Sequence, residues 1–502
     1  MDQLGADLVS RLDLLGSIEA EIAGPPDMLP SRVMESVAAA HTTELAERLR
    51  GELGAQVHLT KGELIWASKA RLHARPIHAL PFRERCIYRA LVQDVAGAQP
   101  TSKEQIDASA EFKRAVLVRG VRWVAQADVA AFFQFIDHEA LADEVILRTA
   151  KSDSASHLRA MLFELVGRGF GLPQNLWSSR LLSEFYLQPV ETELAQLGFT
   201  VTRFSDDFRI GTRTVSEAFK GIEQLQYLLH ERGLTLNEVK SRVLSRASYT
   251  RSLDRLDDRI TAALEAVHVD PELLDPYSDN PAGEIDEELE GPGTTLFTDA
   301  LTHLRGTKVD PFDVIFYRQL LRLGLALLGM ANSPGAIAEG PNLMTMDPSL
   351  TPSFAKYLRG IRPTVGAETV IRGLDSVARS LAAYAPDWQA GWLMTPMLDR
   401  SIKPTTRLMN WARRLWEGTG ASPLRSRGAL VLSLHGVLSP NDLASAFKHT
   451  PNVSKPELIA SMALGAHEGA PSRPVEAVLE AEPVNRWIYD YTVQHEDDLA
   501  WV

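Results

Sequence analysis

Residues 201–210 constrain the possible fold more than any other part of this chain. Apolar and β-branched residues alternate there on both sides of Ser205, Asp206 and Asp207, a pattern typical of two short strands joined by a tight turn. Two adjacent aspartates repel each other when both are ionised, and a divalent cation is their most direct counter-charge. Acidic pairs in hairpin turns also occur simply as solvated turn residues. The remaining sequence has to decide between these two interpretations.

Composition indicates an ordinary globular protein. The chain has 502 residues, of which 45% are hydrophobic and 23% charged, and this length predicts two to four domains. We expect a cytoplasmic protein, because the N-terminus lacks a signal-peptide pattern and no run approaches the roughly 18 apolar residues of a membrane helix. Cys86 is the single cysteine, which excludes an internal disulfide and a cysteine-rich zinc site.

Charge is distributed unevenly. The net charge of -13 argues against non-specific coating of nucleic acid, which depends on Lys and Arg neutralising phosphates. Residues 61–89 nevertheless carry seven basic side chains against two acidic ones, and a second basic stretch spans residues 356–427. Each stretch is either a phosphate-facing surface or a solvated basic face.

The predicted elements indicate an α+β protein with four parts. Residues 1–100 contain helices followed by an extended basic segment, and residues 101–250 contain the carboxylate hairpin together with a buried strand at 123–128. Residues 251–295 form a helix and an acidic linker, the linker covering 267–293. Residues 296–502 are predicted to be all-α and repeat-like, because amphipathic stripes recur between Pro and Gly residues.

A third carboxylate follows the buried strand. Asp128 ends the strand at 123–128, and a tight turn with aromatic residues leads from it to a helix beginning at His138. Phosphoryl transfer by two metal ions needs two or three carboxylates from neighbouring strands. Asp128, Asp206 and Asp207 meet this requirement.

Five motifs, in this order, resemble those of the reverse transcriptases, specifically the enzymes of bacterial retroelements and their domesticated relatives. They cover roughly residues 61–244. The motifs are Arg75-Pro-Ile-His-Ala-Leu-Pro-Phe-Arg-Glu-Arg85, Asp128-Val-Ala-Ala-Phe-Phe-Gln-Phe-Ile-Asp-His138, Gly171-Leu-Pro-Gln174, Phe204-Ser-Asp-Asp207 and Gly233-Leu-Thr-Leu-Asn-Glu-Val-Lys240-Ser241. The resemblance implies a right-hand polymerase with fingers in residues 1–100 and a palm in residues 101–250, followed by the all-α domain.

The resemblance also implies roles for individual residues. Asp128 and Asp206 would ligate Mg²⁺, with Mn²⁺ as a substitute, and Asp207 would support them, so that the three form the metal site. The implied deoxynucleotide-binding residues are Lys69, Arg75, Phe133 and Gln174. Phe133 corresponds to the steric gate that excludes a 2′-hydroxyl, and Lys69 and Arg75 would bind the triphosphate. Lys240 would approach the same triphosphate as a proton donor or counter-charge.

The third motif departs from the family pattern. Asn175 stands where a glycine normally follows Pro-Gln, and Trp177 and Arg180 stand where the family has prolines. Since glycine permits close backbone approach, template use could differ from that of a processive enzyme.

The absence of a recognisable thumb, together with the Ser-Asp-Asp centre and the helical C-terminal domain, resembles the abortive-infection and other defence-associated reverse transcriptases. That subgroup implies antiphage defence, homo-oligomers, and in some members templateless synthesis primed by a protein hydroxyl. Implied partners are deoxynucleoside triphosphates and nucleic acid: a DNA product, and an RNA template or non-coding RNA. Two alternatives stay open, namely an RNA-templated retroelement enzyme and a catalytically degenerate polymerase fold used as a binding scaffold.

Overall fold

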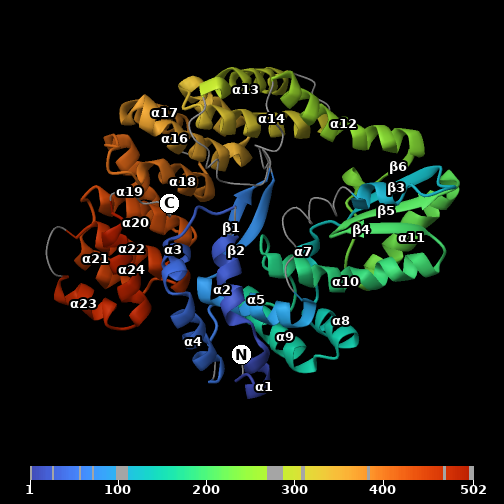
Figure 1. The fold of residues 1–502 in the computed structure, drawn as a ribbon, viewed down its shortest axis with the longest axis horizontal. Helices are drawn as coiled ribbons and strands as arrows, with labels where there is room; N and C mark the ends of the chain where they lie inside the picture. The colour runs from blue at the N-terminus through green and yellow to red at the C-terminus, as the bar shows by residue number, and fades with distance from the viewer. Residues whose placement is uncertain are drawn as a thin grey trace. The chain divides into compact units, whose positions relative to one another are not determined.

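The computed structural model describes residues 3–24, 28–55, 58–69, 73–97, 111–267, 287–306, 311–381, 385–466 and 471–496. These residues form two compact units whose segments alternate along the chain (Figure 1). Unit 1 comprises Met1–Glu21, Thr42–Gly62 and Phe82–Asp257, and unit 2 comprises Ile22–His41, Glu63–Pro81 and Asp258–Val502.

Unit 1 contains a four-stranded sheet and most of the helices from the first half of the chain. Its helices are α1 (Ala6–Arg11), α2 (Leu14–Ala23), α4 (Thr42–Leu53), α5 (Phe82–Ala96), α7 (Phe132–Phe135), α8 (His138–Thr149), α9 (Ser152–Val166), α10 (Trp177–Gln196), α11 (Val215–Glu231) and η1 (Glu238–Lys240). Its strands are β3 (Trp123–Asp128), β4 (Thr200–Phe204), β5 (Asp207–Thr212) and β6 (Arg242–Ser245). Helix α12 (Arg246–Ala266) continues from unit 1 into unit 2.

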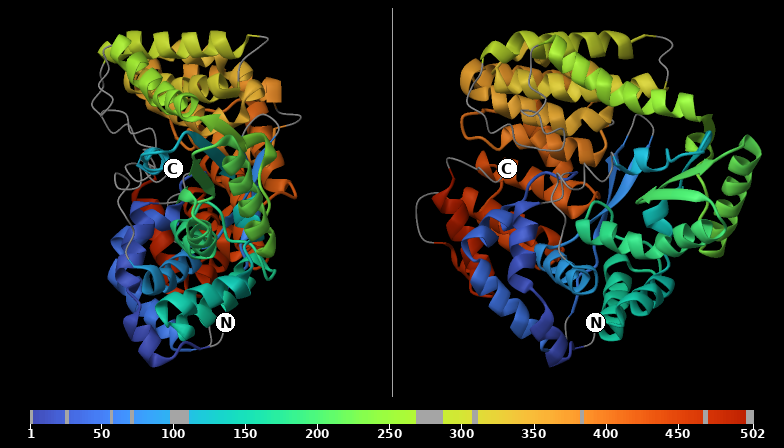
Figure 2. Two further views of the ribbon diagram at one scale, coloured as in Figure 1. Left: turned by 90° about the vertical axis from the view of Figure 1, so that its right-hand side faces the viewer. Right: turned by 45° about the vertical axis from the view of Figure 1, so that its right-hand side comes forward.

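The sheet has the strand order β4-β5-β3-β6, and every neighbouring pair is antiparallel. Helix α11 packs against β3 and β5, as the two views in Figure 2 allow the reader to follow. The side chain of Ile210 on β5 is fully buried, and a Cβ added at Gly221 of α11 would lie 3.0 Å from it. Gly221 therefore allows α11 to approach the sheet closely.

Several predicted elements of unit 1 are confirmed. The strand at 123–128, the two strands around the Ser-Asp-Asp turn and the helix beginning at His138 are present as expected. Thr214 and Glu217 form a capping box at the start of α11, and Gly233 follows the helix with φ +71°, as a C-terminal cap requires. Helix α10 begins at Trp177, whereas the sequence predicts a long helix from about Gln174 to Leu197.

Unit 2 combines an N-terminal helix and a β-hairpin with the C-terminal helices. It contains α3 (Val33–Ala40), β1 (Glu63–Ser68), β2 (Ala74–Ala79), η3 (Glu287–Leu289), α13 (Glu290–Leu304), α14 (Pro311–Met330), η4 (Pro334–Glu339), α15 (Gly340–Met346), η5 (Pro348–Leu350), α16 (Thr351–Val365), α17 (Ala367–Leu381), α18 (Asp387–Met394), η6 (Thr395–Met397), α19 (Thr406–Glu417), α20 (Ser422–Leu434), α21 (Pro440–Phe447), η7 (Asn452–Ser454), α22 (Lys455–Leu464), α23 (Arg473–Leu479) and α24 (Pro483–Gln494).

The C-terminal helices of unit 2 stack in succession, each packing against neighbours close to it in sequence, from α13 and α14 to α22 and α24. The sequence predicts an apolar stripe on α19 that consists of Leu408, Trp411, Ala412, Leu415 and Trp416. The first four are buried and Trp416 is half-buried. The expected α+β fold with a helical C-terminal region is thus confirmed. Most of the predicted acidic linker lies outside the described residues, and its last residues form η3 and the first turn of α13. The division at residues 100, 250 and 295 stays a prediction.

The hairpin β1–β2 joins the helices of unit 2 through its buried face. Ile65 and Ile77 are paired across the strands and are almost completely buried. Helix α18 packs against β1, and the backbone N–H of Ser422 at the start of α20 donates to Glu63 over 2.5 Å. The hairpin therefore folds as a part of the helical unit.

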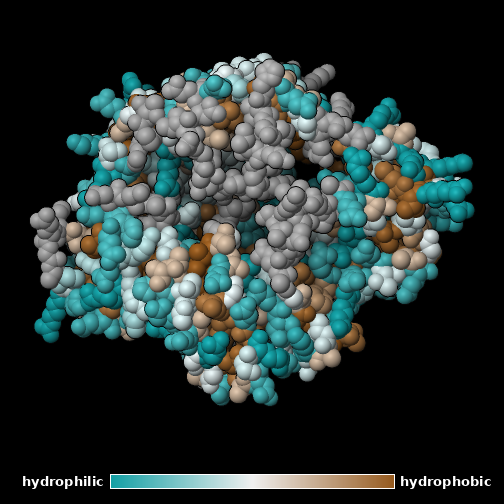
Figure 3. Space-filling model, in the orientation of Figure 1, coloured by the Kyte–Doolittle hydropathy of each residue, from teal (hydrophilic) through white to brown (hydrophobic). Residues whose placement is uncertain are grey.

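The surface is that of an ordinary globular protein. In the orientation of Figure 3, hydrophilic side chains cover most of the coloured surface and hydrophobic ones lie between them in small groups. Within the described ranges, no helix is both long enough and apolar enough to cross a membrane.

Candidate active site

The three predicted carboxylates meet at one end of the sheet. Asp128, the last residue of β3, lies directly opposite Asp207, the first residue of β5. The backbone N–H of Val129 donates to the carbonyl of Asp206 over 3.1 Å, which ties the turn to the end of β3. Ser205 makes this two-residue turn possible by adopting φ +54°. The structure therefore brings Asp128 to Asp206 and Asp207, which follow it by 78 and 79 residues in the sequence.

Electrostatic repulsion is visible within this group. Burial, followed by the negative charges of Asp128 and Asp207, raises the pKa of Asp206 to about 6, and the ammonium of Lys240 opposes the shift. A divalent ion would relieve the same repulsion, so the donor set fits a hard cation. In the part of the chain that the structure describes, however, no three acidic, histidine or cysteine side chains already converge as ligands. The metal site stays a prediction.

Lys240 and Asn237 occupy both oxygens of the Asp128 carboxylate. The Nζ of Lys240 lies 2.7 Å from Oδ1 of Asp128, and Nδ2 of Asn237 donates to Oδ2 over 3.1 Å. The backbone N–H of Asn237 also donates to the carbonyl of Asp128 over 2.7 Å. Lys240 therefore lies beside the predicted metal ligands. Its contact in this structure is the carboxylate of Asp128, and its predicted role at the triphosphate stays a prediction.

Arg203 holds the Ser205–Asp206 turn through a hydrogen bond to its backbone. Its guanidinium is nearly buried and forms ion pairs with Glu184 at 2.7 Å and Glu191 at 3.2 Å. It also donates to the carbonyl of Ser205 over 3.0 Å. Because Arg203 of β4 holds the turn carbonyl, the position of Asp206 depends on a cation that is paired with two carboxylates of α10.

Arg209 approaches the carboxylates from the strand itself. It is nearly buried on β5, and its Nη1 lies 3.6 Å from Oδ1 of Asp207. The guanidinium also covers the ring of Phe112 at 5.0 Å. Sequence reasoning assigned no role to Arg203, Arg209 or Asn237. Their roles depend on contacts between segments that are distant in sequence.

Phe133 and the loop before α10 lie together. Phe133 is half-buried in α7, and its carbonyl accepts the N–H of Leu172 over 2.7 Å. Gly171 adopts φ +93°, and a Cβ there would lie 3.1 Å from the carbonyl oxygen of Gln134. The predicted nucleotide-binding residues Phe133 and Gln174 are therefore on segments that contact each other.

Asn175 replaces glycine without changing the backbone requirement. It adopts φ +66°, a left-handed conformation that Asn tolerates better than most residues. The left-handed backbone that a glycine would adopt here is retained. Asn175 therefore differs from the family's glycine only by the bulk of its side chain. Helix α10 starts at Trp177, two residues after Asn175, because a left-handed residue interrupts a helix.

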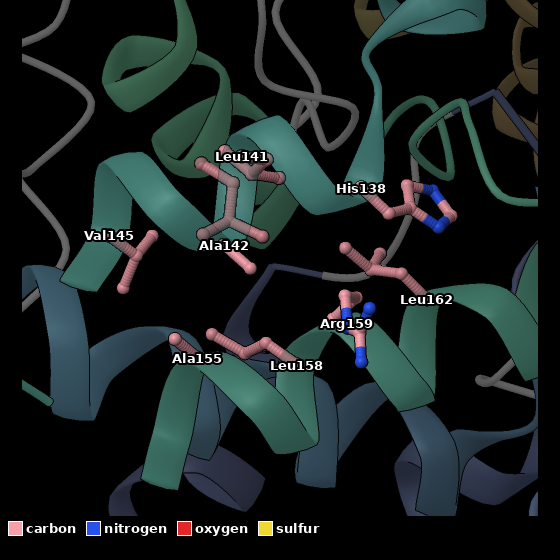
Figure 4. Close-up of a pocket in the computed structure, with 9 residues that line it drawn as sticks. His138, Leu141, Ala142, Val145, Ala155, Leu158, Arg159 and Leu162 are labelled. Carbon is pink, nitrogen blue, oxygen red and sulfur yellow. The ribbon is translucent and has the colours of Figure 1, made fainter. Parts of the chain in front are cut away.

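His138 fixes the same loop from α8. Its Nε2 lies 2.6 Å from the carbonyl oxygen of Gly171, and burial lowers the pKa of the imidazole. Figure 4 shows His138 at one end of a small pocket between α8 and α9. The other lining residues are Leu141, Ala142, Val145, Ala155, Leu158, Arg159, Leu162 and Leu182. This lining is mainly apolar and includes none of the predicted catalytic residues.

The two predicted triphosphate ligands share the hairpin of unit 2. Arg75 lies half-buried on β2, with Nη1 3.8 Å from the sulfur of Met28. The carbonyl of Met28 accepts from the indole N–H groups of Trp388 at 2.7 Å and Trp392 at 3.3 Å. Lys69 follows β1, and its side chain is exposed. Helix α18 thus positions the residue that contacts Arg75, a connection the sequence does not reveal.

Comparisons with known proteins find one family model that matches part of the chain. Residues 68–266 match the family described as Reverse transcriptase (RNA-dependent DNA polymerase). No curated protein matches the chain. Among solved structures, apo telomerase from Candida tropicalis is 12% identical, with a TM-score of 0.30 and coverage of 71% of this chain and 74% of that one.

Two further telomerase structures are similar at the same level. Telomerase from Candida albicans with a TWJ fragment of telomeric RNA is 12% identical, with a TM-score of 0.30 and coverage of 68% of this chain and 62% of that one. Telomerase from Candida tropicalis with such a fragment is 13% identical, with a TM-score of 0.29 and coverage of 70% and 67%.

The family match includes all five motifs and every residue predicted for the site, from Lys69 to Lys240. It agrees with the sheet that places Asp128 opposite Asp207. Residues 68–266 therefore resemble a reverse transcriptase domain, and this match supports an RNA-dependent DNA polymerase.

Proposed function

We propose that this chain extends a hydroxyl group with deoxynucleotides by Mg²⁺-dependent phosphoryl transfer at Asp128, Asp206 and Asp207. The observation that carries the proposal is the register between β3 and β5, which sets Asp128 against Asp207 with Asp206 in the adjoining turn. Carboxylates from neighbouring strands are what two-metal phosphoryl transfer requires.

The three carboxylates would hold the ions. Bound Mg²⁺ would supply positive charge to the attacking and departing oxygens during phosphoryl transfer. Asp128 is oriented for this task by Asn237, and the turn that carries Asp206 is held by Arg203. Mn²⁺ would substitute for Mg²⁺, since both accept carboxylate oxygens as ligands.

In the proposed reaction, the hydroxyl oxygen of the primer forms a bond to the α-phosphorus, and the bond from that phosphorus to pyrophosphate breaks. The hydroxyl proton leaves to solvent. Lys240 stands beside Asp128, where its ammonium would neutralise or protonate the departing pyrophosphate. Arg75 and Lys69 would bind the triphosphate as phosphate-directed cations.

Phe133 would select the sugar. Its ring is half-buried and packs against Phe132 with a centroid distance of 5.3 Å, which limits its freedom to move aside. A fixed ring under the sugar leaves no room for a 2′-hydroxyl. Replacing Phe133 by Val should therefore increase incorporation of ribonucleotides relative to deoxynucleotides, while deoxynucleotide incorporation persists.

The carboxylates are tested by incorporation of labelled deoxynucleotides with Mg²⁺ or Mn²⁺. The double variant Asp206→Asn with Asp207→Asn should lower the rate by many orders of magnitude, because it removes the charge that clamps the ions. Asp143→Asn is the matched control, since Asp143 is an exposed carboxylate on α8. Retained incorporation by the double variant would refute the assignment of the site.

The same assay separates the open alternatives. Each deoxynucleotide is supplied separately, with and without co-purifying RNA, and the product is tested for attachment to the protein after denaturation. Activity that depends on added RNA supports a templated retroelement enzyme. Single-nucleotide products bound to protein support templateless, protein-primed synthesis, and no incorporation under any condition supports a binding scaffold.

We also propose a role in antiphage defence, supported by the resemblance of the motifs and of the helical C-terminal region to abortive-infection enzymes. Phage should form fewer plaques on cells that express the chain than on cells that express the Asp206→Asn, Asp207→Asn variant. Equal plaque numbers across a broad phage panel would count against this role. The oligomeric state expected for that subgroup is measured by light scattering of the purified protein.

A further inference from the structure

The segment that follows Gly233 contacts Asp128 through two side chains of different kinds. Asn237 donates an amide N–H to Oδ2 over 3.1 Å, and Lys240 places its ammonium 2.7 Å from Oδ1. Both oxygens of a carboxylate that is predicted to bind metal are therefore engaged within the protein. A metal ion that binds Oδ1 has to displace the lysine.

The backbone of Asn237 is fixed, because both its N–H and its carbonyl form hydrogen bonds. Its N–H donates to the carbonyl of Asp128 over 2.7 Å, and its own carbonyl accepts the N–H of Lys240 at 3.2 Å and that of Ser241 at 3.0 Å. The hydroxyl of Ser241 donates to the same carbonyl over 2.8 Å. The amide of Asn237 thus approaches Asp128 from a fixed backbone.

The side chain of Lys240 is held far less firmly. It is 52% exposed, whereas the side chain of Asp128 is 10% exposed. A lysine ammonium is a compact charge on a flexible stem, so it can leave Asp128 without losing its hydration.

Charge makes the lysine and a divalent ion mutually exclusive at Oδ1. Both seek the same lone pairs, and two cations that share one carboxylate oxygen repel each other. A divalent ion brings twice the charge to the three carboxylates and interacts with them more strongly. Once displaced, the ammonium of Lys240 remains beside the site, where an anionic phosphate can receive it.

We propose that Asn237 and Lys240 form a latch on Asp128, in which Asn237 holds Oδ2 and fixes the orientation of the carboxylate, and Lys240 holds Oδ1 until a divalent ion displaces it. This inference rests on the proposed function of the three carboxylates. Asn237 is a positioning residue, and Lys240 exchanges between a carboxylate and a phosphate. Entry of the first metal ion and release of Lys240 toward the nucleotide are then one event.

The latch predicts opposite effects for its two members on metal binding without nucleotide. Lys240→Met removes the competing cation, and Mn²⁺ should bind about fivefold more tightly, which corresponds to about 1 kcal/mol, the upper range for a partly exposed ion pair. Asn237→Ala frees the carboxylate to rotate, and Mn²⁺ should bind more weakly. Two residues that merely stabilise the fold would not shift the affinity in opposite directions.

The experiment is a titration of the full chain with Mn²⁺ at pH 8, in which free Mn²⁺ is measured by electron paramagnetic resonance. Lys220→Met is the matched control, because Lys220 is an exposed lysine on α11, and it should leave the dissociation constant unchanged. Thermal unfolding midpoints of all variants are recorded. If Asn237→Ala fails to fold, Lys240→Met decides the matter alone, because a half-exposed side chain leaves no buried cavity.

The outcomes separate this inference from the proposed function. Mn²⁺ binding that is equal in the wild type and in Asp128→Asn would remove the metal site and the proposed function with it. Binding that depends on Asp128 but is unchanged or weakened by Lys240→Met would overturn the latch alone. Tighter binding in Lys240→Met with weaker binding in Asn237→Ala supports it.

Discussion

Glu457 on α22 is a buried carboxylate beside two buried or nearly buried arginines of unit 2. Its side chain is 2% exposed, and its Oε1 lies 3.1 Å from Nε of Arg32. Arg427 is completely buried and donates to the carbonyl of Ser31. Burial lowers the pKa of Arg427 to about 10, and the charge of Glu457 opposes this effect. We predict that Glu457→Gln severely destabilises unit 2.

The magnitude follows from the two cations that the substitution leaves behind. Glutamine retains the shape of the side chain and removes the charge, so that Arg32 loses its buried ion-pair partner and Arg427 loses one of the two carboxylates, with Glu35, whose charge offsets its burial. Removing one partner of a buried ion pair costs about 3–5 kcal/mol. For a unit of this size, the unfolding midpoint should fall by on the order of 10 °C.

The effect should also reach the hairpin, because Arg32 donates to the carbonyl of Leu80 over 3.2 Å. Thermal unfolding followed by near-ultraviolet circular dichroism measures the stability, and hydrogen exchange of peptides from residues 73–81 measures the hairpin. Glu476→Gln is the control: its pair with Arg486 is about one-third exposed on both sides, so its loss should cost less than about 1 kcal/mol.

A loss in Glu457→Gln as small as that of the control would refute the reasoning, because it would mean that the arginines are solvated. The combined variant Arg32→Met with Glu457→Met gives a second criterion. Because it removes one charge of each sign, it should be less destabilised than the sum of the two single variants. Additive losses would show that the two side chains do not interact.

Three further predictions concern His138 and Asn175 at the loop before α10, and a truncated chain that lacks the C-terminal helices. Burial lowers the pKa of His138, so the unfolded chain binds more protons and stability falls as the pH drops through about 6.5, by at most about 1.4 kcal/mol per pH unit; His138→Gln should abolish this component in urea unfolding at pH 7.5 and 5.5, and an unchanged pH dependence would refute it. Asn175→Ala should cost about 1 kcal/mol through its φ of +66° while Asn175→Gly should not; equal unfolding midpoints would contradict this. A chain ending at residue 266 should bind a hydrophobic dye, because β1–β2 loses α18 and α20, and a monomeric, dye-free product would count against it.

The sequence predicts the centre of unit 1 well because its signals are local. Strand 123–128 is short, apolar and ends at Asp128, and the hairpin around Asp206 alternates in hydropathy. Each pattern predicts both the strand and the residue at which the strand ends, so the three carboxylates could be placed at strand ends. Their meeting required only that neighbouring strands be antiparallel, as the register between Asp128 and Asp207 shows.

The supporting residues could not be predicted because their roles depend on contacts between distant segments. Arg203 looks like an exposed cation of an edge strand, yet it is buried against Glu184 and Glu191 of α10. Asn237 reads as a turn residue, and only the pairing of its backbone with the end of β3 brings its amide to Asp128. Local composition contains no information about either partner.

The hairpin that carries Arg75 packs with the C-terminal helices within unit 2. The hairpin that carries Arg75 belongs to unit 2 by its packing, although the reverse transcriptase match begins at residue 68, within β1. Met28 contacts Arg75 and is itself held by Trp388 and Trp392 of α18. If Arg75 binds the triphosphate, its orientation depends on the stability of α18, so a ligand that binds and orders the C-terminal helices would also stabilise the hairpin for its substrate. Under that proposal, destabilising α18 would weaken nucleotide binding through Met28 and Arg75.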